Sequence, residues 1–372
     1  MRGHAVQPFV IAAGGTGGHF FPAEALAAEL IARGHRVVLM TDGRSGALNS
    51  AVFAGREQHV ISGAGIAGRG VMRGARAIAG LAAGSLQARR ILRDIDAAAV
   101  IGFGGYPSVP PVLAARSLRR RPLIVLQEQN AVLGRANIFL SRFADVLALG
   151  VANTRRVPLG ITSEVSGNPV RPEISALHGA RYAAPDGTIN LLVLGGSLGA
   201  RVFSDIVPDA VAALPDALRA QLTITQQCRA EDLPRVREIY AAAGVKANLA
   251  PFFNDVADRL RVAHLLVARA GASTCAELAV AGRPSILVPL PGAIDDHQTA
   301  NAAALAQAGA AEIIRQSDFS SAALAKRLEA RLADSAGLTR MAAAASAIGR
   351  PVAAAALADI VERHAALREH AA

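Results

Sequence analysis

Short, nearly continuous apolar runs alternate with longer segments rich in Ala and Leu in the first half of the chain. Such runs predict strands buried on both faces, because a strand with one exposed face shows polar residues at every second position. The predicted strands cover residues 8–15, 36–42, 97–105, 122–129 and 144–150. Two helices are predicted at 22–33 and 73–93. A third follows the strand 97–105 and ends at about 118, and a short fourth helix lies between the strands 122–129 and 144–150. This alternation predicts an α/β domain with a parallel sheet between two helical layers.

The same pattern restarts in the second half, where residues 189–201 again read as strand, glycine loop and helix start. Further strands are predicted at 222–227, 246–252, 264–273, 284–291 and 310–316. The tail from about 320 to 370 is predicted to be helical, with a break near 349–351. We therefore predict two similar Rossmann-like domains, residues 1–166 and 167–349, with the segment 167–172 as the linker.

The charge of the chain narrows the range of partners. The 372 residues carry a formal net charge of +10, and nearly all of the basic residues are arginine. This excess allows an anionic membrane, a phosphorylated small molecule or nucleic acid as partner. Trp is absent, aromatic residues make up 4% of the chain and no nucleic-acid-binding signature is visible, so we expect no nucleic acid.

The cysteines and the apolar segments limit the cellular context. Cys228 and Cys275 lie far apart and form neither a ligand cluster nor a disulfide framework, which is typical of a reducing cytoplasm. The N-terminal apolar run leads directly into a glycine loop and is too short for a signal peptide. The uncharged stretch 97–115 contains three Gly and three Pro, and we interpret it as strand, loop and helix rather than a membrane span.

The first chemical motif is the glycine-rich segment 14–19, which follows the first strand and ends in His19. Glycines let the backbone approach a ligand, and the free N–H groups of a helix start favour an anion. No register of this segment supplies G-x-G-x-x-G or the Lys of a P-loop, which disfavours nicotinamide and P-loop chemistry. His19 can take a proton from a sugar hydroxyl near neutral pH, although a purely structural histidine fits the same position.

Four further polar segments lie at predicted strand ends. They are the segments 127–130, 195–200, 269–277 and 295–301. The glycine loop 195–200 has backbone N–H groups and a hydroxyl suited to a diphosphate. In the segment 269–277, Glu277 is expected in the first turn of a helix. Glu277 could chelate a ribose diol, or it could only cap its helix together with Thr274. Cys275 reads as a small buried residue rather than a nucleophile. The adjacent acidic residues and histidine of 295–301 suit sugar hydroxyls better than a metal.

Taken together, these segments resemble the MurG family of bacterial peptidoglycan glycosyltransferases. The resemblance rests on seven motifs in the same order and spacing: GGTGGH at 14–19, GFGGYP at 102–107, EQN at 128–130, GNPVR at 167–171, GGSLGA at 195–200, the segment from Arg269 to Glu277, and D-x-Q-x-x-N at 296–301. It implies a GT-B fold, in which two Rossmann-like domains face each other across a cleft, with the helix 350–372 packing back on the first domain.

The resemblance also implies an activity. It is an inverting transfer of N-acetylglucosamine from UDP-GlcNAc to the muramyl sugar of lipid I, an undecaprenyl-pyrophosphate-linked intermediate, which gives lipid II. No cofactor and no metal are expected, since helix N-termini and Arg171 can offset the diphosphate charge. We expect a peripheral enzyme at the cytoplasmic face of the bacterial inner membrane, with other cell-wall synthesis proteins as possible partners.

The resemblance assigns roles to individual residues. His19 is the candidate base, and Tyr106, Gly104 and Gly105 lie on the acceptor side. The donor contacts carried over from the family are Thr16, Gly17, Gly18, Asn130, Arg171, Ser197, Phe253, Ala272, Ser273, Thr274, Glu277 and Gln298. Phe253 stands where the family more often has a smaller aliphatic residue.

A lipid acceptor requires a membrane-facing surface. Arginines accompany apolar residues at 69–93, and a second basic run comprises Arg116, Arg119, Arg120 and Arg121. Such a surface suits an anionic interface, while an ordinary solvated helix face has the same composition. Three other functions remain open: a glycosyltransferase with another acceptor, a UDP-GlcNAc epimerase, and a non-catalytic sugar-nucleotide-binding protein.

Overall fold

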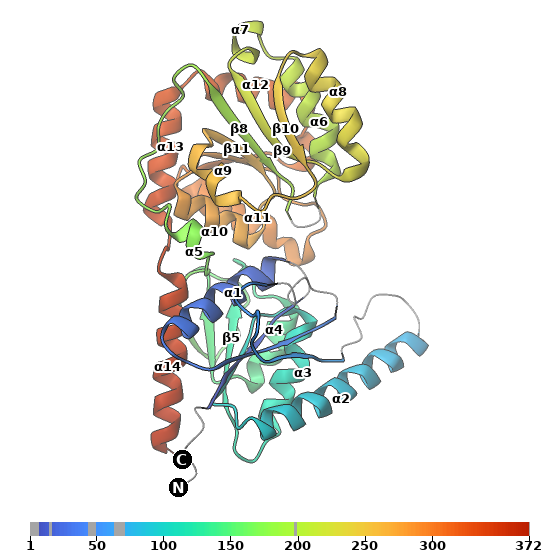
Figure 1. The fold of residues 1–372 in the computed structure, drawn as a ribbon, viewed down its shortest axis with the longest axis vertical. Coiled ribbons are helices and arrows are strands. Elements are labelled where there is room, and N and C mark those ends of the chain that lie inside the picture. Colours follow the sequence, from blue (N-terminus) through green and yellow to red (C-terminus); the bar gives the residue numbers. More distant parts are fainter. Residues whose placement is uncertain (1–6, 15–16, 44–49, 63–70, 197–198, 372) are drawn as a thin grey trace. The chain divides into compact units, whose positions relative to one another are not determined.

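The protein consists of two compact units, seen in a computed structural model that describes residues 7–14, 17–43, 50–62, 71–196 and 199–371. Unit 1 comprises Met1–Arg171 and Val352–Ala372, and unit 2 comprises Pro172–Pro351 (Figure 1). The chain thus leaves unit 1 inside the segment 167–172 and returns to it next to the helix break at 349–351.

Unit 1 is built on a seven-stranded parallel sheet with the order β3-β2-β1-β4-β5-β6-β7. The strands are β1 (Phe9–Ala12), β2 (Val37–Thr41), β3 (Gln58–Val60), β4 (Ala99–Gly102), β5 (Leu123–Glu128), β6 (Val146–Leu149) and β7 (Thr162–Val165). The five strands predicted here are confirmed, each somewhat shorter than expected. The edge strands β3 and β7 were not predicted, because they are three and four residues long and consist mostly of polar residues without a buried apolar run.

Alternate residues of these strands supply two separate cores, one on each face of the sheet. Phe9 and Ile11 of β1 pack with α1 (Gly17–Ala32) and α14 (Ala353–Ala371). Val10 and Ala12 face the other way, toward α2 (Val71–Asp94), α3 (Gly105–Arg116) and α4 (Arg135–Leu140). Burial on both faces explains why the central strands are uninterrupted apolar runs.

The first helix begins earlier than the sequence predicts. Its first turn comprises Gly17, Gly18 and His19, which we had placed in the loop before a helix starting at residue 22. Gly14 follows β1 closely enough that a Cβ there would lie 2.8 Å from Thr41 Oγ1 and 3.2 Å from Pro107 Cγ. The chain therefore passes from strand to helix within a few residues, and His19 lies at the helix N-terminus rather than in a loop.

Unit 2 repeats the architecture with a six-stranded parallel sheet of order β10-β9-β8-β11-β12-β13. The strands are β8 (Ile189–Leu194), β9 (Leu222–Gln227), β10 (Lys246–Ala250), β11 (Leu265–Ala268), β12 (Ser285–Leu287) and β13 (Ala311–Ile313), and all six were predicted. The helices are α5 (Pro172–Ser175), α6 (Arg201–Ala212), α7 (Asp216–Arg219), α8 (Leu233–Ala242), α9 (Val256–Val262), α10 (Ala272–Ala281), α11 (His297–Gln307), α12 (Ser321–Leu332) and α13 (Ser335–Ile348). The predicted helical tail has a second break, where the Asp334 carboxylate accepts a hydrogen bond from Gly337 N (2.7 Å) and starts α13.

Two apolar segments have the length of a membrane span. The stretch 97–115 forms β4 and most of α3, as predicted. Among the described helices, Ser335–Arg368 has a mean hydropathy of 1.4 over its most apolar window. This run is divided between α13, which packs against α10 in unit 2, and α14, which packs against α1 in unit 1. Its apolar side chains thus contribute to the cores of two different units.

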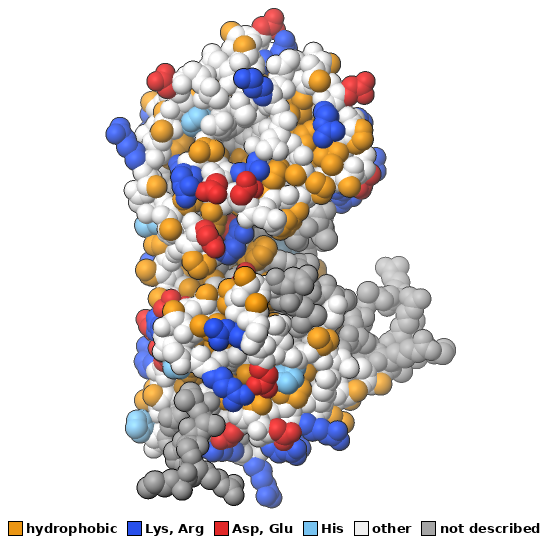
Figure 2. Space-filling model, in the orientation of Figure 1, with side chains coloured by type: hydrophobic (Ala, Val, Ile, Leu, Met, Phe, Trp, Pro, Cys, Tyr) orange, Lys and Arg blue, Asp and Glu red, His pale blue; other side chains and the backbone are white. Residues whose placement is uncertain are grey.

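Charged side chains are distributed rather than gathered on the face drawn in Figure 2. Lys and Arg are spread over the described surface there, with Asp and Glu beside several of them. Some arginines are paired with neighbouring carboxylates, as in Arg93–Asp94 (2.9 Å) and Arg120–Asp96 (3.0 Å).

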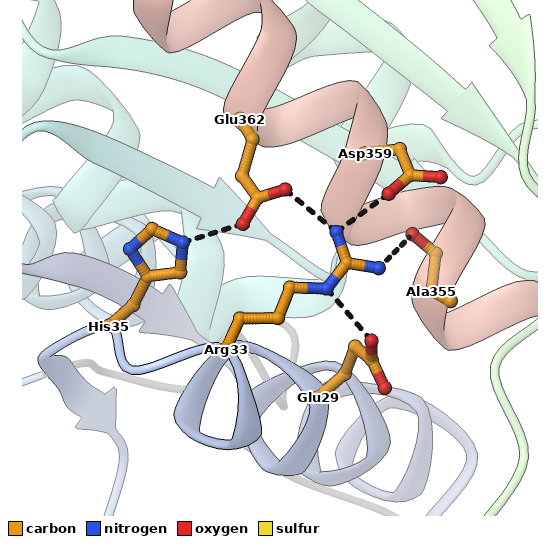
Figure 3. Close-up of polar contacts among 6 residues, drawn as sticks. All are labelled: Glu29, Arg33, His35, Ala355, Asp359 and Glu362. Carbon is orange, nitrogen blue, oxygen red and sulfur yellow. Dashed lines mark hydrogen bonds and ion pairs between the residues drawn. The ribbon is translucent and has the colours of Figure 1, made fainter.

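A cluster of ionic contacts fixes the start of α14 on α1 (Figure 3). Arg33 donates to Glu29 (2.8 Å), Asp359 (2.6 Å), Glu362 (2.7 Å) and the Ala355 carbonyl (3.2 Å). Glu362 also pairs with His35 Nε2 at 2.5 Å. The hydrogen bond to Asp359 is the main cause that raises the pKa of Arg33 further above its usual value. One guanidinium thus joins the end of α1 to two turns of α14.

We expect Arg33→Ala to loosen α14 by about 1–2 kcal/mol, because the contacts are charged but partly exposed to solvent. Amide hydrogen exchange of peptides from α14 measures its opening free energy directly. The control is Arg36→Ala, which removes the exposed Arg36–Glu57 pair from the same unit. Unchanged α14 protection in Arg33→Ala would show that apolar packing alone holds the helix.

Two further acidic residues, Glu164 and Asp145, bind the later turns of α14. Glu164 of β7 accepts from Arg363 and pairs with His364 Nε2 (2.7 Å), while Asp145 pairs with Arg368 (3.0 Å) and Arg121. The hydrogen bond from His364, and after it that from Arg363, lowers the pKa of Glu164 below its usual 4.5, against the opposing effect of burial. The negative form of Glu164 is therefore stabilised in the folded state.

A carboxyl group whose pKa is lower in the folded state than in the unfolded state stabilises the fold at pH values above its unfolded pKa. This stabilisation is lost as the pH falls through the folded pKa. We expect Glu164→Gln to destabilise unit 1 at pH 7 by at most about 1 kcal/mol, and the difference from wild type to shrink as the pH falls below 4.5, the usual pKa of this carboxyl group. Denaturation followed by circular dichroism at pH 7 and at successively lower pH measures this difference, with the exposed Asp94→Asn as control. A difference that persists at low pH would contradict the ionic interpretation.

Candidate functional site

The loops that follow the central strands of unit 1 lie at one edge of the sheet. Strand β1 pairs with β2 on one side and with β4 on the other, so the connections after β1 and after β4 diverge at the carboxyl end. Ligands bind at this point in open parallel α/β sheets. The glycine segment after β1 and the pair Gly104–Gly105 after β4 therefore occupy the expected position.

The imidazole of His19 lies beside Gly104 and Gly105, on the side where a larger residue would carry its Cβ. A Cβ placed on Gly104 would lie 3.6 Å from His19 Cε1, and one on Gly105 would lie 3.6 Å from Cδ2 and 3.7 Å from Nε2. Both glycines have positive φ, 81° and 66°, a conformation that disfavours residues with a side chain. These glycines begin α3, and His19 lies half-buried beside them. The structure thus brings together the candidate base and two of the three residues predicted for the acceptor side.

Gln129, just after β5, connects His19 to the interior. Its Oε1 lies 3.0 Å from His19 Nδ1, and its Nε2 donates to the Phe103 carbonyl (3.0 Å) and to Gln127 Oε1. Gln127 in turn donates from Nε2 to the Glu128 carbonyl (3.3 Å). Both glutamine side chains are buried, so their amide groups are held by protein partners.

Glu128 organises the loop that follows β5. Its buried carboxylate accepts hydrogen bonds from Asn130 N (3.0 Å), Asn130 Nδ2 (2.9 Å), Gly134 N (2.9 Å) and Asn137 Nδ2 (2.9 Å). Several donors on one carboxylate offset the cost of removing it from water. Asn130, predicted to contact the donor, is therefore held in place by its neighbour Glu128.

The remaining predicted residues of unit 1 lie in different surroundings. Tyr106, in the first turn of α3, has 45% of its surface exposed, which leaves it accessible to a ligand. Arg171 lies with its guanidinium 4.9 Å from the ring of Phe21 on α1. Gly17 and Gly18 are in the first turn of α1. Thr16 lies outside the described residues.

The matching loop of unit 2 follows β8 and is braced by a glutamine. Gln227, the last residue of β9, accepts from Gly195 N (3.0 Å) and donates to the carbonyls of Gly196 (2.9 Å) and Pro251 (3.1 Å). Gly196 has a φ of 84°. A side chain on Gly195 would clash with the backbone of Ala200, 2.4 Å from the Cβ position. Ser197 lies outside the described residues.

The segment after β11 forms the start of α10. Gly271 is the N-cap, without a side-chain cap, and Ala272, Ser273 and Thr274 form the first turn. The expectation that Glu277 lies in this first turn is wrong, because a helix starting at Ala272 places Glu277 in the second turn. A capping box has its acidic residue at the third helical position, which in α10 is Thr274.

Cys275 and Arg269 are structural parts of this segment. Cys275 is buried, and burial raises its pKa to about 12, as expected for a small core residue rather than a nucleophile. Arg269 donates to the carbonyls of Val288 (3.0 Å) and Pro289 (3.2 Å) and to Gln316 (2.7 Å), so it joins the ends of β11, β12 and β13.

The last two predicted donor residues are held by contacts within unit 2. Phe253 is buried, with the guanidinium of Arg259 3.9 Å from its ring centre, which explains how this position accommodates an aromatic ring. Gln298, in the first turn of α11, accepts from Leu290 N (2.9 Å) and so holds the loop after β12. It follows Asp295 and Asp296, which both have positive φ.

The predicted donor residues therefore divide between two sheets. Thr16, Gly17, Gly18, Asn130 and Arg171 belong to unit 1, and the remaining seven belong to unit 2. Within each unit the described ones follow strand ends or lie at helix starts, except Glu277 in the second turn of α10. Among the described residues, no group of three or more His, Cys, Asp or Glu is arranged to hold a metal ion.

The sequence motifs predict no role for Gln129, Asn137 or Gln227. The signal for Gln129 was its place in the polar run 127–130 after a buried strand, and that for Gln227 was the pair of glutamines that ends β9. Asn137 gave no signal, because it lies within a helix and reaches Glu128 only through the fold.

Known proteins match this chain over nearly its whole length. The glycosyltransferase family 28 N-terminal domain matches residues 9–148, and the family 28 C-terminal domain matches residues 190–363. A protein of Granulibacter bethesdensis is 57% identical over 97% of this chain and 95% of its own length, and one of Acidiphilium cryptum is 55% identical over 97% and 98%. Both carry the name UDP-N-acetylglucosamine--N-acetylmuramyl-(pentapeptide) pyrophosphoryl-undecaprenol N-acetylglucosamine transferase.

Solved structures of similar fold include a member of the same family. The crystal structure of Acinetobacter baumannii MurG superposes with a TM-score of 0.77 at 32% identity, over 96% of this chain and 99% of that one. A putative UDP-N-acetylglucosamine 2-epimerase of Listeria monocytogenes reaches a TM-score of 0.66 at 15% identity, over 96% of each chain, and shares the fold alone. With both domain matches and relatives above half identity over nearly its full length, the chain belongs to the MurG family of glycosyltransferase family 28.

Proposed function

We propose that the protein transfers N-acetylglucosamine from UDP-N-acetylglucosamine to the muramyl sugar of lipid I, producing lipid II and UDP with inversion of the anomeric centre. The observation that carries the proposal is the position of His19, at a helix N-terminus beside Gly104–Gly105 and at the ligand-binding edge of the unit 1 sheet. The names of the relatives, which cover nearly the whole chain, support the same substrates.

In the proposed reaction His19 acts as the general base. Its Nε2 takes the proton of the acceptor hydroxyl while the hydroxyl oxygen attacks the anomeric carbon from the side opposite the diphosphate. The bond between this carbon and the diphosphate oxygen breaks, and its electron pair leaves with UDP. The proposal needs no metal: Arg171 and the N-termini of α1 and α10 supply positive charge or N–H donors for the departing diphosphate.

The family motifs assign donor contacts within each unit. Ala272, Ser273 and Thr274 present the N-terminus of α10, and Glu277 in its second turn holds the ribose. Asn130, Gln298 and the glycine loops contact the sugar and the phosphates. Residues 16 and 197 have the same assignment from the family motifs.

We expect His19→Ala to lower kcat by about 10²- to 10⁴-fold, the usual contribution of a general base, with little change in the affinity for UDP-N-acetylglucosamine. The measurement is UDP release with and without a lipid I analogue, in the presence and absence of EDTA. Acceptor-dependent, EDTA-insensitive release by the wild type supports the proposal. Release without acceptor would indicate an epimerase, and tight donor binding without release would refute the transferase assignment.

We also propose that unit 1 binds the anionic cytoplasmic surface of the inner membrane, where the lipid acceptor resides. Exposed Arg89, Arg90 and Arg93 on α2 lie beside Leu86, which is 64% exposed. Arg142 lies 5.6 Å from the ring of the exposed Phe139. Basic and apolar side chains together favour such an interface. Arg69 lies outside the described residues, as do the side chains of Arg73 and Arg76.

The exposed pair Arg116 and Arg119 at the end of α3 tests this proposal. At about 1 kcal/mol per basic residue near an anionic surface, Arg116→Glu/Arg119→Glu should weaken binding to phosphatidylglycerol-containing vesicles by at least about tenfold. Vesicle co-sedimentation at low and high salt measures this effect. The matched control is Arg237→Glu/Lys246→Glu, which reverses two exposed charges of unit 2. Equal loss in both double variants would mean that net charge, not this surface, drives binding.

A further inference from the structure

A chain of buried amides in unit 1 ends at the imidazole of His19. It runs from Gln127 through Gln129 to His19 Nδ1, with 3.0 Å between Gln129 Oε1 and that nitrogen. Gln127 is fully buried and Gln129 is 2% exposed, so water does not compete for these groups. The chain joins the end of β5 to the start of α1.

Backbone carbonyls determine the direction of every hydrogen bond in this chain. A carbonyl oxygen only accepts, so the Phe103 carbonyl at 3.0 Å requires the nitrogen of the Gln129 amide on its side. The Glu128 carbonyl at 3.3 Å imposes the same orientation on Gln127, whose Oε1 then faces Gln129 Nε2. Gln129 Oε1 is thereby turned to His19, and Nδ1 of the imidazole has to be the donor.

We propose that Gln129 is a positioning residue for the transfer reaction: it holds neutral His19 in the Nδ1–H tautomer and so leaves Nε2 as the proton acceptor. This inference rests on the proposed function only for its consequence in catalysis; the tautomer itself is a property of unit 1. In a neutral histidine the nitrogen opposite the hydrogen-bonded N–H is the basic one. Nε2 is also the nitrogen that lies beside Gly105, on the predicted acceptor side.

An amide suits this role better than a carboxylate. A carboxylate at the same distance would favour the protonated imidazolium, which cannot accept a proton. The neutral Gln129 sets the tautomer without this electrostatic bias. Gly104 and Gly105 have positive φ and no side chain, so the imidazole is held by an amide at Nδ1 while its Nε2 edge faces two residues that add no side chain beside it.

The direct test is the ¹⁵N spectrum of the histidine side chains in the full-length protein at about pH 8, where free histidine is neutral. His19→Asn identifies the resonances of His19. We expect a protonated Nδ1 and an unprotonated Nε2 in the wild type. In Gln129→Met, which keeps the length and removes both amide atoms, we expect His19 to shift toward the Nε2–H form that free imidazole side chains prefer. An Nε2–H tautomer in the wild type would overturn the proposal.

A matched control separates the tautomer from general loosening of the interior. Gln127→Met removes the neighbouring buried amide of the same chain but leaves the acceptor for His19 in place. We expect it to retain the Nδ1–H form of His19. Circular dichroism and thermal unfolding verify that the variants fold. If Gln129→Met does not fold, the wild-type spectrum by itself decides the question, because an Nε2–H tautomer there overturns the proposal.

Turnover gives the second readout. We expect Gln129→Met to lower kcat by about 10- to 100-fold with little change in KM for the sugar nucleotide. Gln129→Glu restores an acceptor for Nδ1–H, so its kcat should exceed that of Gln129→Met. Its carboxylate favours the imidazolium, so the acid-side limb of its pH–kcat profile should move to higher pH. A Gln129→Met enzyme that loses activity but keeps the Nδ1–H tautomer would assign Gln129 a structural role and overturn the proposal.

The two proposals fail in different ways. If the wild type shows no acceptor-dependent UDP release while His19 has the Nδ1–H tautomer, the proposed function is wrong and the tautomer assignment stands. If transfer is active and His19 is the Nε2–H form, the function stands and Gln129 does not position the base.

Discussion

Both sheets are entirely parallel, and most of the structure follows from this constraint. Parallel strands need crossover helices, which cover the two faces and leave only the ends of the strands accessible. Backbone N–H groups at helix starts and polar side chains after strands then meet at the carboxyl edge. In unit 1 this edge collects His19, Gly104, Gly105 and Gln129 from segments that lie far apart in the sequence.

Buried amides hold these strand-end loops in both units. Gln129 joins the end of β5 to α1 and to the Phe103 carbonyl, and Gln227 joins the end of β9 to the glycine loop and to the Pro251 carbonyl. A glutamine offers donors and an acceptor without a charge, so it can brace a backbone in the interior without the desolvation cost of an ion. Where a charge is used, as in Glu128, four hydrogen bonds from neighbouring groups surround it.

The return of the chain to unit 1 combines apolar and ionic contacts. Leu357 and Val361 of α14 are buried in the same core as Phe9 and Ile11, which provides the hydrophobic part of the attachment. Arg33 and Glu164 bind side chains of α14 at successive turns, so they select the register in which those apolar residues dock. The last helix thereby becomes part of the fold that carries His19.

The sequence by itself determined the two α/β domains, the helix break before α14 and the strand ends that carry the motifs. Apolar runs and glycine loops are local signals, and both sheets have to be parallel when strands and helices alternate. The short edge strands β3 and β7 could not be predicted from the sequence, because their pairing depends on the neighbouring strands rather than on their own side chains. The first residues of α1 and α10, Gly17 and Ala272, likewise depended on tertiary context. Because α10 begins at Ala272, Glu277 lies in its second turn. Only the tertiary structure decided that Gln129 faces His19, since residues 110 positions apart in the sequence meet only when β5 and α1 occupy the same sheet edge.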